Sequence, residues 1–154
     1  HFDVVNSEWA WQGGDKTIES TGNYGILGVP NVANVAGART NYVTWNDGQI
    51  LWLFGGNGLD INGVQGRLND LWKFDPATKI WTWVAGSNEV NAFGVYGSEG
   101  IPDLTNYPGA REGAISWSDS NGNFWMFGGT GLGVFENVAG TLNDLWLYEP
   151  SSNE

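Results

Sequence analysis

The chain has 154 residues, of which 24 are Gly and 10 are Trp, and it carries a formal net charge of −11. A chain of this length can bury a core of its own, but its charge argues against nucleic acid and anionic membrane surfaces as partners, because both are bound through Lys and Arg. With no Cys and a single His, at position 1, the sequence excludes disulfides, cysteine-bound metals and a Ser-His-Asp arrangement inside the fold.

Residues 68–84, LNDLWKFDPATKIWTWV, predict two strands joined by a tight turn. Asp75-Pro76 favours chain reversal, because Pro fixes φ and Asp can bond to its own backbone. The β-branched and aromatic run 80–84 then resumes as a strand. The same pattern recurs at both ends of the chain: residues 1–12 match its second half, and residues 146–154 match its first half.

The chain is an internal repeat of two units, each 72–74 residues long. Residues 37–39, Gly-Ala-Arg, recur at 109–111, and LNDLW occurs at 68–72 and again at 142–146. Each unit predicts four strands. These are strand a at 39–45 and 111–117, strand b at 49–54 and 123–127, strand c at 70–74 and 144–148, and strand d at 8–12 and 80–84. The Gly pairs at 55–56 and 128–129 are expected to end strand b.

Gly-Gly after an aromatic strand, LND before the next strand, and Trp in the last strand resemble the kelch repeat of the galactose oxidase-like β-propellers. The resemblance covers the whole chain, and the long d-to-a segments (13–36 and 87–108) are similar to those of bacterial kelch-containing proteins. It implies an all-β fold with two four-stranded propeller blades per chain. Residues 1–12 would be a strand d that closes a neighbouring blade, 13–84 the first full blade, and 85–154 a second blade without its own strand d.

Two blades cannot close a propeller, which needs about four to eight. Strand d of one copy is therefore expected to dock on the last strand c of the next, in a homo-oligomer with six blades as a trimer or eight as a tetramer. The trimer is favoured. The overlap of 1–8 with 147–154 leaves a second interpretation open, in which the sequence is a segment of a longer array.

In such a blade, the short turns lie on one face and the long connections on the other, where loops on a rigid scaffold commonly bind ligands. Residues 60–63, Asp-Ile-Asn-Gly, have part of the oxygen pattern of a calcium loop but lack its closing Glu, so a polar turn is the preferred interpretation. The candidate binding residues on the long-loop face are Tyr24, Asp60, Asn62, Tyr96, Phe135 and Glu136.

Most Trp residues fall in predicted strands, where they are expected to fill the space between blades rather than to stack on sugars. The residues assigned to blade closure are Trp9, Trp11, Trp72, Trp81, Trp83 and Trp146. Arg39 and Arg111 open strand a, and they are interpreted as structural guanidinium groups that bond to nearby carbonyls or to Asp70 and Asp144.

The favoured function is a non-catalytic binding or structural scaffold with no metal or cofactor, and the alternative is a carbohydrate-binding, lectin-like propeller. A galactose oxidase-like enzyme is the least favoured alternative. The copper site of that enzyme uses two His, two Tyr and a Cys, so its chemistry does not carry over to a chain without Cys or internal His. A protein or glycan ligand is left open. The compartment is also open, with a secreted, periplasmic or cell-surface location favoured.

Overall fold

The computed structural model describes residues 2–3, 5–134 and 138–150. These residues form strands, turns and irregular segments, and the strands that pair do so antiparallel. Within the described ranges there is no helix long and apolar enough to span a membrane. The all-β class predicted from the sequence is therefore confirmed.

The first repeat unit forms one sheet with the strand order β3-β5-β6-β7, in which β4 also pairs with β5. This is the predicted order a-b-c-d, with strand a divided into two pieces because Asn41, between them, has a φ of 54°. The strands are β3 (Arg39–Thr40), β4 (Val43–Asn46), β5 (Leu51–Leu59), β6 (Gln65–Asp75) and β7 (Ile80–Ala85).

The second repeat unit forms a sheet with the order β13-β10-β9 and a smaller one with the order β12-β11-β8. Up to residue 150, where the described part of this unit ends, no strand corresponds to β7, and β13 is the last strand on its side of the sheet. The strands are β8 (Arg111–Glu112), β9 (Ile115–Ser118), β10 (Phe124–Phe127), β11 (Thr130–Gly131), β12 (Gly140–Thr141) and β13 (Leu145–Tyr148).

The expectation that Gly55-Gly56 ends strand b is wrong. β5 continues to Leu59, and the sheet absorbs the glycines as a shift in register between Phe54 and Gly56. Both glycines have positive φ (64° and 94°), which favours a bulge within a strand as readily as a strand end. Residues 57–67, expected from the sequence to be a long connection after strand b, are therefore mostly strand, with the turn confined to 60–64.

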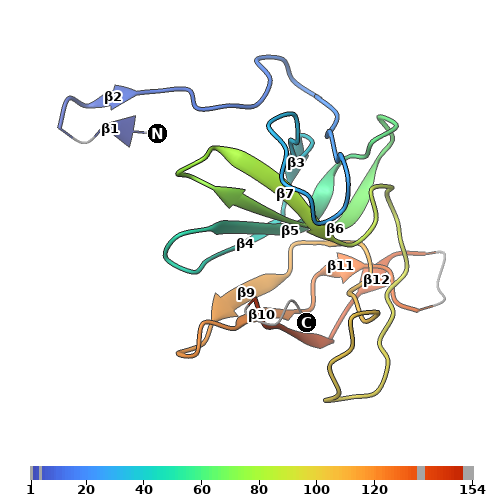
Figure 1. Ribbon diagram of the computed structural model, residues 1–154. Coiled ribbons are helices and arrows are strands. Elements are labelled where there is room, and N and C mark those ends of the chain that lie inside the picture. The colour runs from blue at the N-terminus through green and yellow to red at the C-terminus, as the bar shows by residue number, and fades with distance from the viewer. Residues whose placement is uncertain (1, 4, 135–137, 151–154) are drawn as a thin grey trace.

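Residues 1–12 include a separate hairpin of β1 (Phe2–Asp3) and β2 (Glu8–Trp9) that projects away from the sheets (Figure 1). Its register pairs Phe2 with Trp9, just as Phe74 pairs with Trp81 at the junction of β6 and β7. The hairpin at the start of the chain thus reproduces, 72 positions earlier, the local pairing of strands c and d.

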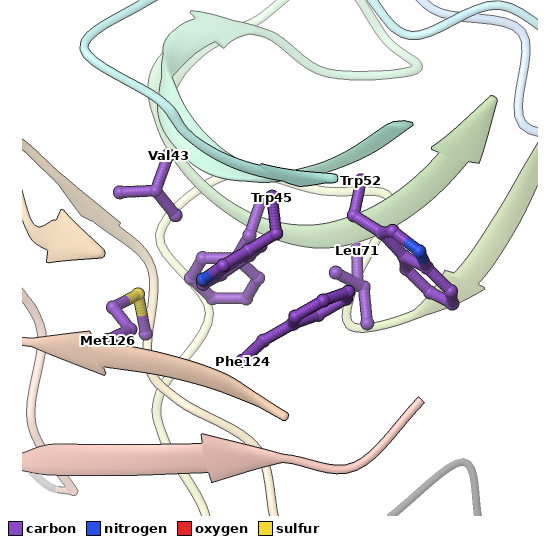
Figure 2. Close-up of a cluster of buried hydrophobic side chains, with 7 residues drawn as sticks. Val43, Trp45, Trp52, Leu71, Phe124 and Met126 are labelled. Atoms are coloured by element: carbon purple, nitrogen blue, oxygen red, sulfur yellow. The ribbon is translucent and has the colours of Figure 1, made fainter. Parts of the chain in front are cut away.

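The core lies between the two repeat units, as Figure 2 shows. Aliphatic and aromatic side chains from one face of β4 and β5 meet Phe124 and Met126 of β10, with Leu71 of β6 beside them. Fully burying a large apolar side chain contributes about 1.5–3 kcal/mol, so this cluster is the main attachment between the units. Its buried members are Val43, Trp45, Trp52, Phe54, Leu71, Phe124 and Met126.

Candidate functional site

The most concentrated polar chemistry in the chain is an Arg-Asp pair buried at the start of β3. Two guanidinium nitrogens of Arg39 donate to Asp70, Nη1 to Oδ1 at 2.6 Å and Nη2 to Oδ2 at 2.8 Å. Two further N–H groups of Arg39 donate to the carbonyls of Gly37 and Gly55, each at 3.1 Å. The side chains of Arg39 and Asp70 are 2% and 0% exposed, so the expected pair is present and fully desolvated.

Tyr24 and Trp72 complete this cluster by donating to the same carboxylate. The Tyr24 hydroxyl and the Trp72 indole N–H each lie 2.7 Å from Asp70 Oδ2. The two rings lie 4.9 Å apart, and the edge of Trp83 approaches Tyr24 at 5.2 Å. Burial and the neighbouring carboxylate raise the pKa of Tyr24 well above its usual range, which keeps the phenol protonated as a donor.

The second repeat unit contains the same cluster. Arg111 donates to both oxygens of Asp144 at 2.7 Å, and the hydroxyl of Tyr96 and the indole of Trp146 each lie 2.7 Å from Asp144 Oδ2. Here the Asp144 side chain is 15% exposed, whereas the Asp70 side chain is fully buried. β7 covers the first cluster, whereas no equivalent strand lies over the second one among the residues that the structure describes.

Acid should therefore weaken the second cluster within a defined range of pH. Burial acts to raise the pKa of Asp144, but the hydrogen bonds from Arg111, Tyr96 and Trp146 outweigh it and lower the pKa to about 2. A depressed pKa in the folded state means that the stabilisation is complete above the unfolded value near 4 and is lost as pH falls towards 2. We expect the difference in unfolding free energy between wild type and Asp144→Asn, measured in urea, to shrink by about 2 kcal/mol between pH 6 and pH 2. A difference that stays constant over that range would contradict the assignment.

These clusters are structural, and this corrects the placement of two candidate binding residues. Tyr24 is 0% exposed, so it cannot contact a ligand on the long-loop face. Tyr96 is half-buried and directs its hydroxyl to Asp144. Each guanidinium is buried, is paired with one Asp carboxylate and also donates to two backbone carbonyls. Neither guanidinium is therefore accessible to an anionic ligand.

Asp60 also has a structural role. It is 2% exposed; its Oδ1 accepts the backbone N–H groups of Asn62 and Val64, and its Oδ2 accepts that of Val90. The carboxylate thus organises a polar turn, as the preferred interpretation of 60–63 held. Asn62 is exposed, and its amide lies 3.5 Å from Glu89. No group of three potential metal ligands occurs in the described part of the chain. Phe135 and Glu136 lie outside the described residues.

The Trp residues of the two d strands have opposite environments. Trp81 packs on Trp72 and Phe74 with ring centroids 6.2 and 4.9 Å apart, and both Trp81 and Trp83 are half-buried. Their counterparts at the start of the chain, Trp9 and Trp11, are 82% and 63% exposed. The same two residues of the repeat are therefore half-buried in one unit and mostly exposed in the other, where Lys16 lies over the Trp11 ring at 4.8 Å.

The irregular segment 13–36, before β3, forms hydrogen bonds with the outer edge of β7. The Gly28 N–H donates to the Trp83 carbonyl at 2.7 Å, and the Asn34 amide donates to the Trp81 carbonyl at 3.1 Å. In the second unit, Asn106 keeps the bond to its own loop, at Ile101, that Asn34 makes to Val29. Sequence analysis gave Asn34 no role, although its recurrence as Asn106, 72 positions later, was the available signal.

The described surface has hollows, two of which are defined by their lining residues. The larger, of about 440 Å³, lies on the outer face of the first sheet, and the smaller, of about 260 Å³, lies beside Arg67 and Asn91. The larger is lined by aromatic, aliphatic and small polar side chains: Tyr42, Thr44, Trp45, Asn46, Leu51, Trp52, Leu53 and Trp81.

The sequence matches no protein-family model and no curated protein. Among solved structures, one titled "Structure of YjhT" is similar over 65% of this chain, with 21% identity and a TM-score of 0.46. The chain spans 23% of the length of that neighbour. A likeness of this strength carries no conclusion about function, which we infer from contacts within the chain.

Proposed function

We propose that the chain is a non-catalytic, kelch-type β-propeller scaffold whose ring is completed head-to-tail by further copies. Each repeat unit would be one blade. The recurrence of the Arg-Asp-Tyr-Trp cluster supports a common blade design, because the same four residue types form the same bonds in both units. The absence of a free nucleophile or base within these clusters favours a structural rather than a catalytic role.

One observation carries the proposal. β13 corresponds to β6 of the first unit, but among the described residues no strand lies beside it as β7 lies beside β6, and 8–12 is a strand-d sequence whose two Trp residues are exposed. Strand edges with unpaired backbone groups are templates for pairing with another chain. Docking of 8–12 from one copy beside β13 of the next would exchange the pairing of Trp9 with Phe2 for one with Tyr148 of the neighbouring copy. Each second blade would thereby gain its strand d, and rotation of that contact closes a ring.

The mass of the particle in solution tests this proposal. Light scattering coupled to size exclusion should give about 50 kDa for three copies or about 67 kDa for four copies of the 16.7 kDa chain. The trimer, with six blades, is favoured over the tetramer, with eight. A particle that remains at the mass of one chain at high micromolar concentration would refute the proposed assembly.

A lectin-like function is the second candidate, and the large hollow favours it. Tyr42, Trp52 and Trp81 line an open space of a size that suits a sugar ring. Screening on a glycan array, followed by titration with Trp fluorescence, tests this candidate. Quenching by one glycan class would support the lectin. Recovery of protein partners without any glycan response would support the scaffold.

A further inference from the structure

The two repeat units contact each other through different faces of their sheets. On the first unit, Val43, Trp45 and Trp52 project from one face of β4 and β5, which we call the front face. On the second unit, Phe124 and Met126 project from β10. They stand at the repeat positions of Leu51 and Leu53, which alternate with Trp52 along the strand, so they lie on the other face of their sheet, which we call the back face. The front face of one unit thus packs on the back face of the next, as Figure 2 shows.

The internal contact is specific as well as apolar. Trp45 stacks on Phe124 with ring centroids 5.3 Å apart and planes within 9° of parallel. The edge of Trp52 meets the same ring at 5.5 Å. The Trp45 indole N–H also donates to the backbone carbonyl of Trp125 at 3.1 Å, which fixes the relative height of the two sheets. An aromatic pair of this kind adds about 0.5–1.5 kcal/mol to the burial of its area.

Each unit presents the other side of this contact to solvent. The front face of the second unit carries Ile115, Trp117 and Phe127 at the positions of Val43, Trp45 and Phe54, and these side chains are 62%, 43% and 40% exposed. The back face of the first unit carries Leu51 and Leu53 at the positions of Phe124 and Met126. Leu51 is 43% exposed, and both leucines line the 440 Å³ hollow.

We propose that the front face of the second unit of one copy packs on the back face of the first unit of another copy, repeating the internal contact between molecules. Trp117 would then lie over Leu51 as Trp45 lies over Phe124, with Ile115 near Leu53. The hollow lined by Leu51 and Trp81 would receive the Trp117 ring. This inference rests on the proposed head-to-tail assembly and adds to it the two sheet faces that meet.

The order of the strands along the chain is consistent with one neighbouring copy that makes both contacts with the second unit. Strand d comes immediately before the next unit in the sequence, so the copy that supplies 8–12 to β13 also supplies the first unit that follows that strand. Strand docking and face packing therefore involve the same pair of molecules. Apolar faces that are both exposed and complementary mark an interaction surface, and the occupant is a second copy because the internal contact already shows the fit.

Two single substitutions test the faces separately. Trp117→Arg blocks the front face and Leu51→Arg blocks the back face, and each variant alone should run as one chain in light scattering with an unchanged circular dichroism spectrum. An equimolar mixture should give a particle of about 33 kDa, two copies of 16.7 kDa, because one intact front face meets one intact back face and the ring cannot close. Ile18→Arg is the matched control, since Ile18 is 88% exposed and lies on neither face; it should keep the wild-type mass.

The outcomes separate this inference from the proposed assembly. If wild type assembles and both blocked variants keep its mass, the two faces are not the interface, although the assembly stands. If each variant is a single chain and the mixture is as well, front-to-back pairing is refuted. If wild type itself is a single chain, the assembly and the inference both fail. Should Trp117→Arg fail to fold, Ile115→Arg, on the same face, replaces it with the same expected masses.

Discussion

Replacing Asp70 with Asn is expected to lower the free energy of unfolding by about 3–5 kcal/mol, the usual result of removing one partner of a buried ion pair. Asp70 accepts two hydrogen bonds from Arg39 and one each from Tyr24 and Trp72, and no solvent reaches it. The amide that replaces the carboxylate would leave the Arg39 charge without a counter-ion and would direct an N–H group at another donor.

Asp144→Asn is the matched control for this prediction, because Asp144 holds the same four bonds in the second unit. Its side chain is 15% exposed, so water can solvate part of the charge left on Arg111, and we expect a smaller loss. Urea unfolding at one fixed protein concentration gives both values, since association adds to the apparent stability. A loss below about 1 kcal/mol for Asp70→Asn would show that the pair adds little to stability.

The repeat made the Arg-Asp pairs predictable. Arg39 and Arg111 occupy the same position in two copies, in a chain with only six basic residues, and an acidic residue recurs in strand c of both. A guanidinium needs a counter-charge when it is buried. The sequence therefore supplied both members of each pair before any distance was known.

Tyr24 shows where that reasoning stops. It lies in a segment with no strand or helix periodicity, and the sequence placed it with the exposed connections. The structure folds this segment back over β7, so that Tyr24 reaches the carboxylate of Asp70, 46 positions later. Such a contact depends on the path of an irregular chain, which local propensity does not determine. The bulge at Gly55 was missed for a related reason, because a glycine with positive φ can end a strand or continue it.

Replacing both Trp9 and Trp11 with Ser is expected to abolish assembly while leaving each chain folded. The two side chains are 82% and 63% exposed in the single chain, so their removal should lower its unfolding free energy far less than the loss of two packed Trp side chains would. In the proposed ring they occupy the positions of Trp81 and Trp83, against Trp146 and Tyr96 of the neighbouring copy. Light scattering should therefore show a shift from the mass of three or four chains to that of one.

The same double substitution at Trp81 and Trp83 provides the contrast, because these residues pack within the chain on Trp72, Phe74 and Tyr24. Their loss should lower the free energy of unfolding by several kcal/mol, so that urea midpoints fall whatever the state of association. Equal destabilisation by the two double variants would mean that 8–12 already packs within its own chain. A ring of unchanged mass after loss of Trp9 and Trp11 would mean that the strand is dispensable. Only the combination of a folded single chain from the first pair and a destabilised fold from the second fits a strand d that is built for a neighbour.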